Sequence, residues 1–169
     1  MFPGPHLERS RMNDREQDRV ALPLLDRLMS DSPPTRVGRG DSMRDLKASL
    51  CRDLTALLNT RRAEQDFDPA FEESANSILT FGIMDFTAFN LRNRIDQEAV
   101  RLSIERSIRR FEPRLANVSV TVQDTDPVRP MLRFEISAVM RINGCSEDVY
   151  FDAALYRDSR RISVSGGNA

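Results

Sequence analysis

The sequence predicts an α+β domain in which two main helices pack on one face of a mostly antiparallel sheet. Two observations support this fold class. Along two stretches, apolar residues recur at steps of three and four, the period of an amphipathic helix. Further along the chain they alternate with polar residues, the period of a half-buried strand. We expect a flexible N-terminal extension over residues 1–40 and a single domain over residues 41–169.

The extension is predicted from its proline, glycine and charged residues, which are typical of a segment outside the core. It contains one apolar stretch, in which Leu25, Leu28 and Met29 share a face at helical spacing and Pro23 fits the first turn. A single short helix is marginal by itself. We therefore expect this helix either to fold back on the domain or to dock in a groove of a partner.

The first long helix is predicted to begin at Asp41 or Ser42, because either side chain can cap it, and to end at Asn59–Thr60. Cys51 borders its apolar stripe, where we expect a small core residue rather than a reactive thiol. The stripe itself falls on one face at steps of three and four. Its members are Met43, Leu46, Leu50, Leu54, Leu57 and Leu58.

Between the two long helices, residues 70–90 predict no long regular element. A short helical turn is expected around residues 71–73 and a turn at Gly82, in a segment that packs over the core.

The second long helix is predicted to have Asp96 as its N-cap, with Ile95 packed against Val100 across the cap. Its apolar stripe is Val100, Ile104, Ile108 and Phe111. Several arginines lie mostly off this stripe, and we expect them to be solvated and balanced by Glu98 and Glu105. These arginines are Arg101, Arg106, Arg109 and Arg110.

After Pro113 the apolar period changes to two, and three alternating runs and a short last strand near residues 161–164 are expected. Asn143 and Gly144 predict a tight hairpin turn between the second and third strands. The alternation means that one face of the sheet packs on the helices. The first or last strand must be an edge, whose unpaired backbone groups are either protected or used for pairing.

The junction between helix and sheet reads Phe111-Glu112-Pro113-Arg114-Leu115. Pro113 lacks an amide donor and disfavours helical geometry at Glu112, so the helix should stop near Phe111. Arg114 presents a planar fork of donors that suits a carboxylate, on a stiff mount that favours recognition of a partner. The alternative is that Glu112 and Arg114 cap local structure or pair with each other.

Composition limits the possible functions. The net charge is −1 and the hydrophobic content 40%, as in a soluble globular protein, and no signal peptide or membrane-inserting run is expected. Cys51 and Cys145 form no CxxC pair and there is one histidine, so we expect no metal, no cofactor and a cytoplasmic location. Lys47 is the only lysine among 25 cationic residues. This arginine bias reflects either genome composition or a use of arginine in protein interfaces.

Four short motifs, taken in their order along the chain, resemble those of the TssE family, the baseplate wedge subunits of bacterial type VI secretion systems. That family is related to the lysozyme-like wedge proteins of contractile phage baseplates. The resemblance covers about Leu24 to Val164, and Ile83-Met84 departs from it, since a Leu-Pro pair is usual there. The motifs are Leu24-Leu25-Asp26-Arg27-Leu28, Arg52-Asp53-Leu54 with Leu57-Leu58-Asn59-Thr60-Arg61-Arg62, Phe81-Gly82 with Asp85-Phe86-Thr87, and Phe111-Glu112-Pro113-Arg114-Leu115.

The resemblance implies a structural protein without catalysis that links wedge subunits to the sheath. Glu112, Pro113 and Arg114 are then the signature that supports the attachment of the first sheath ring. The neighbouring sheet edge is implied to accept strands from the sheath proteins TssB and TssC, so that it nucleates sheath assembly. The segment Leu24, Leu25 and Leu28 is implied to meet the wedge subunits TssF and TssG, and TssK is a further candidate partner. No small-molecule substrate is implied.

Two other functions fit the sequence less well. A lysozyme-like glycoside hydrolase acting on peptidoglycan needs two carboxylates across a cleft, one of them a general acid. Glu112 is the only conspicuous candidate, and Arg114 beside it would favour the ionised form, while Glu135 and Asp152 are predicted on the wet face of the sheet. A nucleic-acid-binding module is disfavoured because aromatic residues are not interleaved with the arginines.

Overall fold

The computed structural model describes residues 28, 39–62, 73, 77–123, 131–142, 145–156 and 158–167. The chain divides into two compact units, Met1–Ser49 and Leu50–Ala169, and helix α3 (Arg39–Asn59) runs from the first into the second. Within the part of the chain that the structure describes, no helix has the length and apolar character needed to cross a bilayer.

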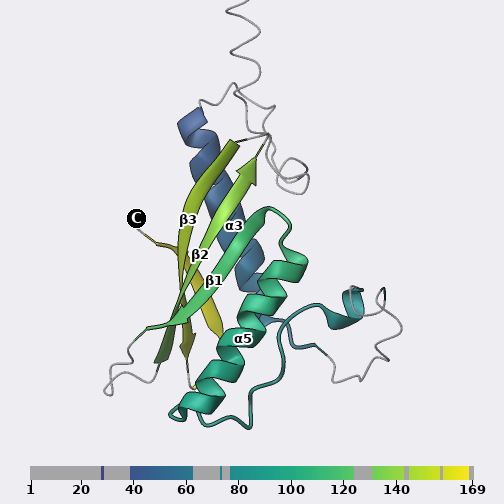
Figure 1. Cartoon of the computed structure of the whole chain (residues 1–169), viewed down its shortest axis with the longest axis vertical. Coiled ribbons are helices and arrows are strands. Elements are labelled where there is room, and N and C mark those ends of the chain that lie inside the picture. Colours follow the sequence, from purple (N-terminus) through teal and green to yellow (C-terminus); the bar gives the residue numbers. More distant parts are fainter. Residues whose placement is uncertain are drawn as a thin grey trace, which may run out of the picture. The chain divides into compact units, whose positions relative to one another are not determined.

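Four antiparallel strands make up the sheet, in the order β1-β2-β3-β4 (Figure 1). Their bounds are Leu115–Val122 for β1, Met131–Ile142 for β2, Cys145–Tyr156 for β3 and Ile162–Gly166 for β4. Ile142 of β2 lies opposite Cys145 of β3, so these strands pair as the predicted hairpin, although its turn residues Asn143 and Gly144 lie outside the described residues. The α+β fold class and the short last strand are confirmed as well.

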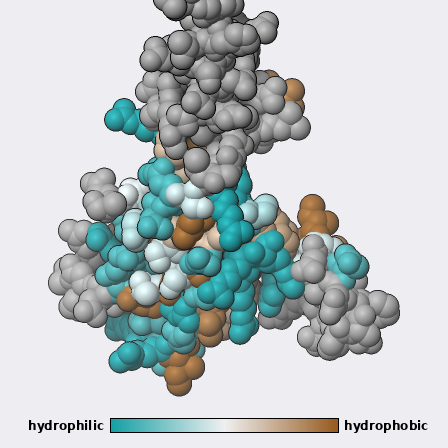
Figure 2. All heavy atoms as spheres, turned by 45° about the horizontal axis from the view of Figure 1, so that its top comes forward, coloured by the Kyte–Doolittle hydropathy of each residue, from teal (hydrophilic) through white to brown (hydrophobic). Residues whose placement is uncertain are grey.

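Only one face of the sheet is buried, so both helices cover that face and leave the other to solvent. The buried side chains alternate along β2 and β3, as the period-two pattern predicts, and from Val118 onwards in β1, where a register shift between Ala116 and Ser119 interrupts the alternation. They are Leu115, Val118 and Val120 in β1, Leu132, Phe134, Ile136, Ala138 and Met140 in β2, Val149, Phe151, Ala153 and Leu155 in β3, and Ile162 in β4. Hydrophilic residues cover most of the described surface in the view of Figure 2, with hydrophobic ones in small groups.

Helix α5 (Arg94–Phe111) runs beside β1 (Figure 1) and buries Val100, Ile104 and Ile108 of the predicted stripe. The predicted cap is wrong. Asn93 is the N-cap, because its side chain accepts a hydrogen bond from the Ile95 N–H at 3.1 Å.

Asp96 instead lies in the first turn of α5, where it accepts a hydrogen bond from the Asn90 N–H at 2.8 Å. Ile95 is 77% exposed, so the predicted packing of Ile95 on Val100 is also wrong. Asn93, three residues before the predicted cap, bonds an unpaired amide at the start of the helix. The position of Asp96 alone therefore did not determine where the helix begins.

Helix α3 ends at Asn59, as predicted, but begins at Arg39 rather than at Asp41 or Ser42. Several neighbouring residues can open the first turn of a helix, so its start can lie a few residues before a capping side chain. Cys51 is half-buried at the border of the stripe, and desolvation raises the pKa of its thiol, which disfavours the reactive thiolate.

Between the helices, the chain forms the short helix η1 (Ile78–Thr80) and then turns at Gly82, whose φ is 104°. The prediction of no long regular element is confirmed for residues 77–90. Of the short helical turn predicted near residues 71–73, only Glu73 is described, and it is helical; residues 71 and 72 lie outside the described residues.

Candidate functional site

The turn between α5 and β1 is built from backbone hydrogen bonds around Pro113. Glu112 is the C-cap of α5: its N–H donates to the Ile108 carbonyl at 2.9 Å, while its φ of −118° and ψ of 82° leave the helical region. The Leu115 N–H donates back to the Glu112 carbonyl at 3.1 Å, which closes the turn where β1 begins. The predicted stop at Phe111 is confirmed.

Arg114 joins two carboxylates in this turn. Its Nε and Nη2 donate to Glu112 Oε1 and Oε2 at 2.6 and 2.5 Å, and Nη2 also donates to Asp53 Oδ2 on α3 at 2.5 Å. The Glu112 side chain is 8% exposed and that of Arg114 is 27% exposed. The hydrogen bond with Glu112 raises the pKa of Arg114, so the guanidinium stays charged. Mutual pairing of Glu112 and Arg114, one of the alternatives from sequence, is therefore present, with Asp53 as a third member.

Part of Arg114 remains free to meet another molecule. Guanidinium carries five N–H donors, and the Nη1 of Arg114 makes no hydrogen bond to any described residue. Arg114 thus ties α3 to the start of β1 and still presents donors at the surface.

The second and third sequence motifs meet at Gly82. A Cβ on this residue would lie 2.3 Å from the Thr60 carbonyl oxygen, so the close approach and the positive φ both require glycine. The Ile83 N–H donates to the Thr60 carbonyl at 2.9 Å, and Ser107 Oγ of α5 donates to the Gly82 carbonyl at 2.8 Å. Gly82 therefore holds the end of α3 and the middle of α5 together.

Aromatic contacts complete this junction. The Arg61 guanidinium lies 4.2 Å from the centre of the Phe86 ring, and burial lowers the pKa of Arg61. The rings of Phe81 and Phe111 meet edge to face at 5.1 Å. Arg61 Nη2 also donates to the Arg160 carbonyl at 2.7 Å. The motifs Arg52 to Arg62, Phe81 to Thr87 and Phe111 to Leu115 thus form one packed frame.

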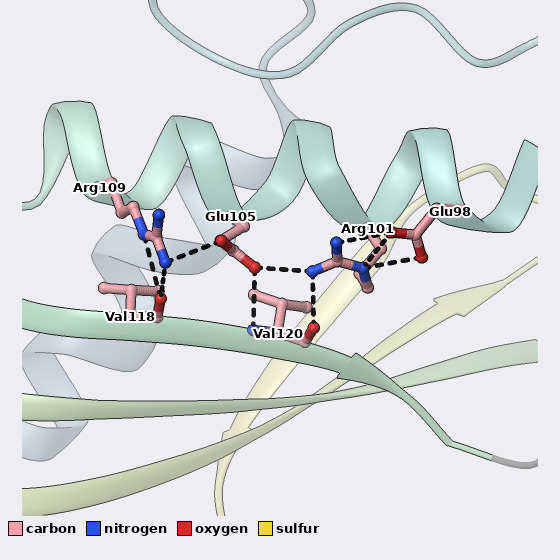
Figure 3. Close-up of polar contacts among 6 residues, drawn as sticks. All are labelled: Glu98, Arg101, Glu105, Arg109, Val118 and Val120. Carbon is pink, nitrogen blue, oxygen red and sulfur yellow. Dashed lines mark hydrogen bonds and ion pairs between the residues drawn. The ribbon is translucent and has the colours of Figure 1, made fainter.

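The outer edge of β1 is covered by three charged side chains of α5, Arg101, Glu105 and Arg109, which we call the edge clamp (Figure 3). Arg101 Nη1 donates to the Val120 carbonyl at 2.9 Å. Arg109 Nε and Nη2 donate to the Val118 carbonyl at 3.1 and 2.6 Å. Because these edge groups are already bonded, β1 cannot use them to pair with another strand.

Glu105 is the centre of the edge clamp. It is 14% exposed and pairs with Arg101 at 2.7 Å and with Arg109 at 2.8 Å, while the Val120 N–H donates to it at 3.4 Å. Arg101 in addition pairs with Glu98 at 2.6 Å, and this hydrogen bond lowers the pKa of Glu98. The predicted balance of the arginines by Glu98 and Glu105 is confirmed. The prediction that Arg101 and Arg109 are merely solvated is wrong, since both bind the β1 backbone.

The edge of β4 differs from that of β1. The Tyr156 N–H donates to the Arg161 carbonyl at 2.9 Å, and the Gly167 N–H donates to the Tyr150 carbonyl at 2.9 Å. Backbone groups alternate in direction along an antiparallel strand, so the N–H and C=O of the even-numbered residues of β4 point away from β3.

The first of these outward residues is occupied and the next two are not. Asn59 Oδ1 accepts from the Ile162 N–H at 3.0 Å, and Asn59 Nδ2 donates to the Ile162 carbonyl at 2.7 Å. Within the described ranges, no side chain or strand bonds to the outward groups of Val164 and Gly166. Gly166 is exposed, so this part of the edge is uncovered.

A groove of about 740 Å³ lies beside the β4 edge. It is shallow and mixed in character, with apolar and hydroxyl side chains beside the two cations Arg52 and Arg161. Its lining includes Cys51, Thr55, Ala56 and Asn59 of α3 and Ile162, Ser163 and Val164 of β4. Side chains of a strand added to β4 would fit against it.

The predicted N-terminal contact residues belong to the first unit. Leu28 is helical and 74% exposed, and Leu24 and Leu25 lie outside the described residues. No cluster of three or more His, Cys, Asp or Glu side chains in the described ranges has the placement to hold a metal ion.

Sequence reasoning missed the edge clamp and Asn59. A signal for the edge clamp does exist, since Arg101, Glu105 and Arg109 follow one another at steps of four, with the acid between two bases. Asn59 carries no such signal, because its partner Ile162 lies 103 residues away.

A family model described as baseplate wedge protein gp25 matches residues 44–144. No curated protein matches the chain significantly. The matched range takes in most of α3, all of α5 and the strands β1 and β2, which hold the turn at Pro113 and the edge clamp.

Proposed function

The chain belongs to the family of baseplate wedge protein gp25, a structural component of phage-tail-like baseplates, and from this premise we propose that it is a TssE-type adaptor. In this role it links the wedge of a type VI secretion baseplate to the first ring of the contractile sheath and nucleates sheath assembly. The open edge of β4 is the observation that carries the proposal.

Strand addition is the proposed mode of sheath attachment. The unbonded N–H and C=O groups of Val164 and Gly166 offer main-chain hydrogen bonds to an extended segment of a sheath subunit. The adjacent groove between α3 and β4 would receive alternate side chains of that segment and so favour one register. Repetition around a baseplate ring would turn individually weak contacts into a stable platform.

Glu112, Pro113 and Arg114 are proposed as a second contact with the sheath. Glu112 fixes the guanidinium of Arg114, so that less conformational freedom is lost when the unbonded Nη1 meets a partner oxygen. A charge-assisted hydrogen bond of this kind contributes about 1.5–3 kcal/mol. This turn lies at the opposite side of the sheet from β4, roughly three strand spacings or 14 Å away, so the two contacts would meet different sheath segments.

The remaining partners follow from the same role. Leu24, Leu25 and Leu28 are proposed to dock on the wedge subunits TssF and TssG, and TssK is a further candidate. Leu28 supports this proposal because it is helical and its side chain is exposed. TssB and TssC are the proposed sheath partners, and the cytoplasm is the proposed location.

A peptidoglycan hydrolase is the alternative function, and the geometry gives it little support. Both oxygens of Glu112 accept hydrogen bonds from Arg114, so this carboxyl group is occupied by its own chain. Glu135 and Asp152 lie opposite each other on the polar face of the sheet. Neither residue lines the groove beside β4 or the cavities that include Arg62 and Arg92. We propose that the protein has no enzymatic activity.

Replacing Val164 by proline tests the proposal. Val164→Pro removes one outward N–H donor from the open edge. It breaks no hydrogen bond to β3, so the fold should survive. Val164→Ala is the matched control, because it shortens the same side chain but keeps the outward N–H. We expect Val164→Pro to retain TssF and TssG but to lose TssB and TssC in co-purification. Retention of the sheath proteins at the wild-type level would contradict the proposed use of β4.

A further inference from the structure

A second polar cavity lies along another flank of α5, and Arg109 of the edge clamp borders it. Its volume is about 770 Å³, within the range of protein ligand pockets. It runs along α5 from Ala99 to Phe111, roughly 18 Å of helix at 1.5 Å per residue. Residues Thr80 to Met84 and Arg62 form the facing wall.

This cavity is strongly basic. Arg62, Arg106, Arg109 and Arg110 line it, and no aspartate or glutamate does. Arg109 is engaged in the edge clamp, but the guanidinium groups of Arg62, Arg106 and Arg110 make no ion pair or hydrogen bond within the described part of the chain. Three unpaired cations around one hollow raise the local positive potential, although the whole chain carries a net charge of −1.

The rest of the lining suits a peptide. Ser103 Oγ accepts a hydrogen bond from the Met84 N–H at 3.1 Å, which leaves its own O–H free to donate towards a ligand. Met84, Ala99 and Phe111 are half-buried and supply an apolar surface between the guanidinium groups.

We propose that this cavity binds an acidic segment of a partner protein, whose carboxylates pair with Arg62, Arg106 and Arg110. Arg106 and Arg110 are four residues apart on one face of α5, a rise of about 6 Å. Two residues of an extended chain span about the same distance, so carboxylates at every second position could pair with both arginines. The apolar surface would receive a side chain between them. This site goes beyond the proposed attachment of the sheath at β4 and does not depend on it.

Nucleic acid fits the same charges less well. Stacking of bases needs exposed aromatic faces, and the aromatic residue of the lining, Phe111, is half-buried and packed against Phe81. Phosphates on a convex duplex would reach the rim of a hollow rather than its floor.

The test uses a short fluorescent peptide of glutamate and alanine with one central leucine, titrated with the full chain at low salt. Its charge-reversed counterpart, with lysine for glutamate, and a DNA duplex serve as competing probes. We expect the acidic peptide alone to bind, and Arg106→Gln with Arg110→Gln to weaken its binding about tenfold or more. The fold should be unaffected because both side chains are exposed and unpaired.

The matched control removes two arginines from the polar face of the sheet. Arg133→Gln with Arg141→Gln changes the net charge equally, and we expect binding to stay within about twofold. An equal loss in both double variants would show a non-specific charge effect and overturn the inference, as would tighter binding of the DNA duplex than of the acidic peptide.

The chain has its own acidic stretch, with Glu64, Asp66 and Asp68 just after Arg62. A variant with Gln, Asn and Asn at these positions should bind the acidic peptide as the parent does. If this variant instead bound it about tenfold more tightly, the chain's own acids would occupy the cavity and the assignment to a partner would be wrong.

Discussion

The two edges of the sheet are treated in opposite ways. Along β1, the edge clamp bonds the backbone of Val118 and Val120 with side chains from the neighbouring helix. Along β4, Asn59 bonds Ile162, and the outward groups of Val164 and Gly166 stay uncovered. An exposed edge is an aggregation hazard unless it is protected or used.

This difference identifies the edge that is available for assembly. The edge nearest to Arg114 is β1, and it is occupied at its centre, so a sheath strand would have to displace three charged side chains to pair there. Pairing at Val164 and Gly166 of β4 would require no such displacement. Under the proposed function, closure of the β1 edge would therefore direct strand addition to β4.

The largest expected effect is on the closed side of the sheet, at Arg114. Arg114→Ala leaves the buried carboxylate of Glu112 without its guanidinium, and we expect a loss of about 3 kcal/mol in the free energy of unfolding. Urea denaturation measures it. Asp53→Ala is the control: Asp53 is the more exposed member, so its loss should cost about 1 kcal/mol or less. Equal costs for both variants would contradict the central role of the Glu112 pair.

A smaller effect is expected when the edge clamp is broken. Glu105→Ala removes the acceptor shared by Arg101, Arg109 and the Val120 N–H, at a cost of about 2 kcal/mol. It also frees part of β1, so self-association should increase in light scattering. Glu98→Ala, at an exposed ion pair of the same helix, should cost about 0.5 kcal/mol and leave self-association unchanged. No change in self-association with Glu105→Ala would mean that the clamp does not protect the edge.

The smallest effect is expected at the tie on β4. Asn59→Ala unbonds the N–H and C=O of Ile162 and should cost about 1 kcal/mol, while it lengthens the open edge by one residue. Asn59→Asp keeps an acceptor for the Ile162 N–H but sets a carboxylate oxygen against the Thr55 and Ile162 carbonyls at the end of α3, so it should cost more than Asn59→Ala. If sheath proteins bind at β4, Asn59→Ala should bind them at least as well as the parent, and weaker binding would argue for another edge.

Local patterns predicted the frame of the fold well. The period of the leucines placed α3, Pro113 placed the end of α5, and alternation placed the four strands and their buried face, because these depend on residues close together in sequence. The start of α3 and the cap of α5 were misplaced, because several neighbouring side chains can satisfy the same amides.

The state of the two edges depended on long-range contacts and could not be predicted. Arg109 and Val118 are nine residues apart, yet whether Arg109 faces solvent or β1 depends on how α5 packs on the sheet. The pairing of Asn59 with Ile162 spans 103 residues. For Arg114, the sequence left pairing with Glu112 and contact with a partner open. The first is present and the second remains a prediction.

Residue-resolved amide hydrogen exchange with and without the sheath proteins tests the use of β4 most directly. The account predicts that the exposed amides of Val164 and Gly166 exchange rapidly in the free protein and become strongly protected in the complex, while Val120 does not change. Protection that arises at Val120 and leaves Val164 and Gly166 in rapid exchange would contradict it.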